Sequence, residues 1–75
     1  WNYETIKELL YAPGLGHYFT YGLLAARKIN SVWEPVEFIH DVTTDYLLVK
    51  KMEELFNRYQ LYPIHLRDAI EDMLP

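Results

Sequence analysis

The chain has 75 residues, 51% of them hydrophobic and 24% charged, with a net charge of −4. This length supports one domain, residues 1–75, and the composition is that of a globular protein rather than a disordered one. The acidic balance argues against a double-stranded nucleic-acid surface, which needs clustered lysine and arginine.

The absence of cysteine excludes disulfides and thiolate metal sites, and it favours a cytoplasmic location. No apolar run is long enough to predict a membrane span, and no secretory signal is recognisable. Because the chain opens at Trp1 rather than methionine, we expect further residues before it.

The first half of the chain shows the two-residue alternation of apolar and polar side chains that is typical of strands. Residues 4–11 also fit helical spacing, but we favour a strand that turns at Pro13-Gly14, a type II turn signature. Residues 17–27 carry the strongest strand pattern, rich in aromatic and β-favouring residues. A third strand is expected at about residues 36–40, with Pro35 on an edge or at the strand start.

After Asp41 the apolar residues return every three or four positions, which indicates helices. The pattern predicts a first helix over residues 44–60, capped by Thr43 or Thr44. Pro63 ends this helix and suits the first turn of a second one, over about residues 63–74. The residues expected to be most buried are Leu48, Met52, Phe56, Leu66 and Ile70. The fold class is therefore α+β: a three-stranded antiparallel β-meander followed by two α-helices packed on one face.

Several short patterns resemble a small bacterial, Firmicutes-type protein family of unknown function. They are Tyr21-Gly22, Asp41-Val42-Thr43 and Pro63-Ile64-His65-Leu66, together with Asp68, Ile70, Glu71, Asp72 and Leu74. The resemblance covers most of residues 17–75. It implies no activity, ligand, cofactor or catalytic residue.

The polar set most like a metal site is His40 and Asp41 with His65 and Asp68. His65 and Asp68 are three residues apart on one helical face and can be neighbours. Two imidazoles and a carboxylate could hold zinc with an open fourth position. A role in stabilising helix starts explains these residues better than metal binding does, because Asp41 suits a helix start and Asp68 suits a first helical turn. Strict alternation would also send His40 and Asp41 to opposite faces of their strand.

Catalysis has little support in the sequence, and we expect no enzyme and no cofactor. Ser31 is the only serine, it lies in a predicted turn, and no nucleophile elbow surrounds it. The carboxylates Glu53-Glu54 and Glu71-Asp72 are interpreted as solvated helix faces. A single-stranded nucleic-acid binder would use exposed aromatics, but Arg27, Lys28 and Lys7 are a thin basic complement.

The central strand carries apolar residues on both faces. One face would hold His17, Phe19, Tyr21, Leu23 and Ala25, and the other would hold Tyr18, Thr20, Gly22, Leu24 and Ala26. Two helices can cover only one face of a three-stranded sheet, so the other is covered by loops, Trp1 and Trp33, or meets a partner. Gly22 within this strand indicates a bulge or a close backbone approach.

We therefore expect a small, non-enzymatic interaction or regulatory module with a protein partner, most simply a second copy in a homodimer. The candidate interface residues are Tyr18, Thr20 and Leu24, or their odd-numbered neighbours Tyr21 and Leu23. The alternatives are a metal-binding protein or metal-dependent enzyme using His40, His65 and Asp68, and a single-stranded nucleic-acid binder.

Overall fold

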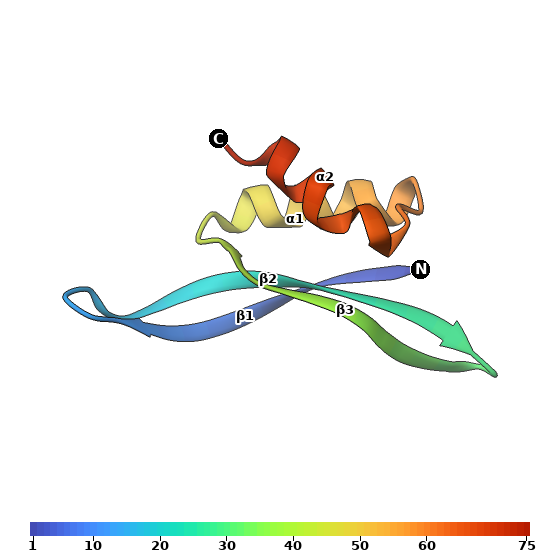
Figure 1. The fold of residues 1–75 in the computed structure, drawn as a ribbon, viewed down its shortest axis with the longest axis horizontal. Coiled ribbons are helices and arrows are strands. Elements are labelled where there is room, and N and C mark those ends of the chain that lie inside the picture. The colour runs from blue at the N-terminus through green and yellow to red at the C-terminus, as the bar shows by residue number, and fades with distance from the viewer.

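A computed structural model describes all 75 residues as a twisted sheet with two helices above it (Figure 1). The elements are β1 (Asn2–Ala12), β2 (Gly16–Ile29), β3 (Val32–Thr43), α1 (Tyr46–Arg58), the short 3₁₀ helix η1 (Pro63–His65) and α2 (Leu66–Met73). The sheet is antiparallel in the order β1-β2-β3, and both helices lie on one of its faces. The predicted α+β architecture is confirmed. Neither helix is long and apolar enough to cross a membrane.

Both strand connections are tight turns, as the sequence predicted. Leu15 N donates to Ala12 O (3.1 Å), and Gly14 between them has φ of 82°, as the third position of a type II turn requires. Asn30 and Ser31 have φ of 51° and 66°, the left-handed pair of a two-residue hairpin turn. The Pro13-Gly14 turn sets a continuous register between β1 and β2, from Asn2–Ala26 to Ala12–Gly16.

The strands are longer than expected and β3 is the least regular. Residues 4–11 are a strand, which resolves the ambiguity of their spacing, and β3 runs well beyond 36–40 on both sides. Two register shifts interrupt the pairing of β2 with β3, one between Tyr21 and Leu23 and one between Ala25 and Ala26. Pro35 lies on this edge strand at the second shift, where a missing N–H costs least.

The core lies between the helices and the odd-numbered side chains of β1 and β2. Its eight buried members are Tyr3, Leu23, Ala25, Val49, Met52, Phe56, Leu66 and Ile70. Four of the five residues expected to be most buried belong to it, but Leu48 is only partly buried and Val49 takes its place. Tyr59, which fits the helical spacing, is 73% exposed because α1 ends at Arg58.

The helices form a hairpin, as the position of Pro63 predicted. Pro63 begins η1, and α2 follows directly from it. The expected cap of α1 was wrong: Asp45, not Thr43 or Thr44, accepts a hydrogen bond from Leu48 N (3.2 Å). Thr43 still belongs to β3, and its hydroxyl accepts from Asp45 N (3.1 Å), so strand pairing moves the helix start two residues later.

Candidate functional site

The structure divides the candidate interface residues between the two faces of the sheet. Leu23 is fully buried against the helices, and the Tyr21 ring packs edge-on against Tyr46 with centroids 5.3 Å apart. Tyr18, Thr20 and Leu24 alternate with them and lie on the opposite face, which no helix covers. We call this second surface the open face. Trp1 does not cover it, because its side chain packs against the core on the helix side.

The middle of the open face is apolar and tightly built around Gly22. A Cβ atom at Gly22 would lie 2.6 Å from the Phe38 ring and 2.7 Å from Ile39 O, so only glycine fits there. The predicted close approach at Gly22 is confirmed. Phe38 in turn stacks on His40, with ring centroids 4.2 Å apart. The neighbouring open-face residues Ile6 and Leu24 are half-buried. Trp33, the cross-strand partner of Lys28 near the β2–β3 turn, is 51% exposed and does not cover this centre.

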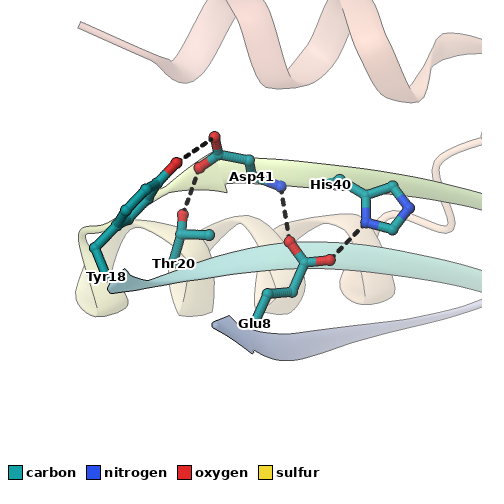
Figure 2. Close-up of polar contacts among 5 residues, drawn as sticks. All are labelled: Glu8, Tyr18, Thr20, His40 and Asp41. Atoms are coloured by element: carbon teal, nitrogen blue, oxygen red, sulfur yellow. Dashed lines mark hydrogen bonds and ion pairs between the residues drawn. The ribbon is translucent and has the colours of Figure 1, made fainter. Parts of the chain in front are cut away.

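A polar cluster lies beside this apolar centre and joins all three strands (Figure 2). Glu8 on β1 contacts His40 Nδ1 (2.6 Å) through Oε1 and accepts from the Asp41 N–H (3.1 Å) through Oε2. Asp41 accepts from the hydroxyls of Thr20 (2.7 Å) and Tyr18 (3.2 Å). Thr20 is completely buried, so its hydroxyl depends on these protein partners.

The cluster exists because Asp41 breaks the alternation of β3. Its φ of 50° lies in the left-handed region, at the first register shift of the strand. Asp41 therefore points to the open face together with its neighbour His40, and both contact Glu8. The expectation that the two side chains point to opposite faces was wrong, and so was the assignment of Asp41 to a helix start. No sequence signal marks an aspartate for this conformation, although aspartate tolerates it better than most residues.

The chemistry available to the cluster is that of a structural network. Partial burial raises the pKa of the Tyr18 hydroxyl, and the charge and hydrogen bond of Asp41 raise that pKa further. Tyr18 therefore stays protonated and donates at neutral pH. Each carboxylate already accepts two hydrogen bonds, and no serine or cysteine lies in the cluster. The cluster can fix the register and twist of the three strands at this point.

The structure does not bring the predicted metal ligands together. His40 lies on the open face beside Glu8, whereas His65 belongs to η1 and Asp68 to the first turn of α2. No three histidine or carboxylate side chains are placed to hold a metal ion. The one surface depression lies on α1 and is lined mostly by charged residues, among them Lys50, Glu54 and Arg58.

A second feature, not foreseen from the sequence, lies along the outer edge of β1. The Asn57 side chain accepts from Tyr3 N (2.7 Å) and donates to Tyr3 O (2.9 Å), as a residue of a neighbouring strand would. Glu53 accepts from Thr5 N (2.7 Å), and Gln60 donates to Trp1 O (3.2 Å). Helix α1, with Gln60 just beyond its end, therefore takes the place of a fourth strand beside the first five residues.

We call these contacts between helix side chains and the β1 backbone the ladder. They can form because the repeat distance along the helix nearly matches that along the strand. Four helical residues rise about 6 Å, and two strand residues advance about 6.8 Å, so Glu53 and Asn57 meet alternate residues of β1. The interpretation of Glu53 as part of a solvated face was wrong, since it is half-buried at the edge of β1. Burial alone would raise the Glu53 pKa, but hydrogen bonds from Lys50 and the Thr5 N–H outweigh it and lower that pKa.

The ladder stops after Thr5, because α1 begins at Tyr46. The Tyr46 ring lies against Tyr21, the cross-strand partner of Lys7. Beyond it the β1–β2 hairpin extends past the helices (Figure 1). Its helix-side residues there are exposed: Leu9 57%, Phe19 56% and Tyr11 65%. Leu9 and Phe19 are cross-strand partners, and the Lys7 ammonium lies 4.2 Å from the centre of the Phe19 ring.

No curated protein and no solved structure matches the chain significantly. A family model described as a family of unknown function, DUF6514, matches residues 1–75, which is a wider span than the resemblance over residues 17–75 implied. The first strand is thus part of what the family shares, and the chain belongs to the DUF6514 family of unknown function.

Proposed function

We propose that this chain is a non-enzymatic interaction module that self-associates through its sheet and so acts as a small regulatory or assembly unit. The observation that carries the proposal is the one-sided cover of the sheet: both helices lie on one face, and no segment of the chain covers the other (Figure 1). Two surfaces remain for a partner, namely the open face and the outer edge of β1 beyond Thr5.

The composition of these surfaces supports a protein partner. The open face combines half-buried Ile6, Leu24 and Phe38 with a polar network whose hydrogen bonds are already made within the chain. An apolar patch with polar surroundings is what protein interfaces use. A nucleic-acid partner would need clustered basic side chains, whereas the open face carries Glu4 and Glu8 against the single Lys28. Within this proposal the protein acts in the cytoplasm of Firmicutes-type bacteria.

The oligomeric state of the purified protein tests the proposal. Static light scattering at about 100 μM, far above the micromolar dissociation constants of modest interfaces, should give twice the monomer mass of 9.0 kDa. Dilution should lower the mass towards that of the monomer. A monomer across the whole range would contradict self-association.

A further inference from the structure

The two edges of the sheet are protected to different degrees. On β3 the edge is interrupted by two register shifts and by Pro35, devices that discourage pairing with another strand. On β1 the pairing with β2 is regular from Asn2 to Ala12, so the outer edge is straight. Protection of this edge by α1 ends at Thr5.

The backbone groups of the unprotected part can be assigned from the ladder. Tyr3 and Thr5 direct their N–H groups to α1 and therefore away from β2. In an uninterrupted antiparallel strand this direction repeats every second residue, so the N–H and C=O groups of Lys7, Leu9 and Tyr11 also point outward. These three residues form what we call the bare edge. It offers a row of strong donors and acceptors that only solvent satisfies within one chain.

From this geometry we infer that the bare edge binds the bare edge of a second copy, forming a continuous six-stranded antiparallel sheet. The inference rests on the proposed self-association and names the surface that carries it. Pairing centred on Leu9 places Leu9 opposite Leu9 of the second copy, and Lys7 opposite Tyr11. About six backbone hydrogen bonds then join the chains, two for each opposed pair.

Charge and side-chain packing favour this register. No like charges face each other directly, because Glu8 lies opposite Leu10 on the open face and Lys7 lies opposite Tyr11 on the helix side. A parallel arrangement in register would instead place Lys7 beside Lys7 and Glu8 beside Glu8, which is unfavourable. The exposed side chains of Leu9, Tyr11 and Phe19 would then gather on one side of the junction.

The distribution of exposed apolar side chains favours the bare edge over the open face as the contact between copies. The strongly exposed apolar side chains Leu9, Tyr11 and Phe19 lie near the bare edge, whereas Ile6, Leu24 and Phe38 in the middle of the open face are half-buried. Trp33, which is 51% exposed, lies near the β2–β3 turn, away from this middle. Edge pairing leaves both open faces uncovered and side by side.

A proline at Leu9 tests the inference. Leu9→Pro removes an outward N–H while leaving the hydrogen bonds between β1 and β2 intact. Across a dilution series from about 100 μM the variant's average mass should fall below that of the unmodified protein, with at least a tenfold rise in the dimer dissociation constant. Leu9→Ala, which keeps the N–H, and Leu24→Arg, on the open face, should remain dimeric. Far-UV circular dichroism checks that each variant is folded.

The outcomes separate the two proposals. If Leu24→Arg is monomeric and Leu9→Pro remains dimeric, the contact lies on the open face, which overturns the edge but not self-association. A monomeric unmodified protein contradicts both.

Disulfide trapping keeps the inference testable if Leu9→Pro does not fold. The chain has no cysteine, so Leu9→Cys places one thiol per chain directly opposite its copy, within the Cα separation that a disulfide spans. Mild oxidation should link this variant at least tenfold faster than Leu15→Cys, although Leu15 in the hairpin turn is the more exposed of the two, at 69% against 57%. Equal rates for the two variants would overturn the edge contact.

Discussion

The two halves of β1 share one strand and one uninterrupted register, yet they have different surroundings. The first half, from Asn2 to Thr5, is bonded on one side to β2 and on the other to the α1 side chains Asn57 and Glu53. The second half, from Lys7 to Tyr11, has only β2. The exposure of a strand edge is thus decided by how far the neighbouring helix reaches, which is a property of another part of the sequence.

The largest difference between the halves should appear in truncations of their tyrosines. Tyr3 is 2% exposed and packs on Phe56 with ring centroids 5.6 Å apart, whereas Tyr11 is 65% exposed on the same side of the strand. Tyr3→Ala should lower the free energy of unfolding by about 3–5 kcal/mol, as core aromatic truncations do. Tyr11→Ala should change it by less than about 1 kcal/mol. Urea unfolding of dilute protein measures both, and equal losses would mean that the halves do not differ.

The helix side chains that bind the edge should contribute the next largest effect. Asn57→Ala leaves the N–H and C=O groups of Tyr3 without their partner and should cost about 1–3 kcal/mol. Arg58→Ala is the matched control, because Arg58 contacts only Glu54 at the surface and should cost less than about 0.5 kcal/mol. If Asn57→Ala lowers the free energy of unfolding no more than Arg58→Ala does, water satisfies the Tyr3 backbone groups as well as Asn57 does.

The Tyr3 hydroxyl should give the first half a distinct response to alkali. Its hydroxyl donates to Leu61 O, and burial raises its pKa from 10.0 to about 12. Because the folded-state pKa is the higher one, the stabilisation is complete below pH 10 and is lost as the pH rises towards 12. Tyr3→Phe should cost about 0.5–1.5 kcal/mol at neutral pH and lose stability less steeply over the alkaline range. If the unfolding free energies of Tyr3→Phe and the unmodified protein fall in parallel with rising pH, the alkaline loss of stability does not come from the Tyr3 hydroxyl.

The smallest expected effect concerns Glu53, which accepts from both Lys50 and the Thr5 N–H. Its lowered pKa means that the carboxylate stabilises the fold above the ordinary glutamate range, and this stabilisation is lost as the pH falls through the folded-state pKa. Glu53→Gln keeps an acceptor for Thr5 but removes the charge. Over the acidic pH range, the unfolding free energy of this variant should change less than that of the unmodified protein. The difference between the two changes should be less than about 1 kcal/mol. If the unfolding free energies of the two proteins depend identically on acidic pH, the charge of Glu53 does not contribute to stability.

Much of the fold follows from local sequence patterns. The change of period near Asp41, the Pro13-Gly14 turn and the break at Pro63 are short-range signals, and each predicted its element correctly. The covered face could not be chosen in advance, because both faces of residues 17–27 are apolar. Only the docking of the helices shows that Leu23 faces inward.

The candidate surfaces were less predictable because they depend on contacts between distant segments. A left-handed Asp41 gathers Glu8, Thr20 and Tyr18, and nothing local marks that conformation. The ladder on β1 uses Asn57, more than fifty residues away in the sequence. Polar residues at helix positions 53 and 57, followed by Gln60, were its only signal, and such polar stripes usually face solvent.

Hydrogen exchange at different protein concentrations is the most direct measurement of the difference between the two halves of β1. The amides of Tyr3 and Thr5 are bonded to α1 within one chain, so they should be protected at every concentration. The amides of Lys7, Leu9 and Tyr11 should exchange rapidly in dilute protein and become protected as a second copy adds to the bare edge. Protection of these three amides that does not change with concentration, whether high or low, would contradict pairing at the bare edge.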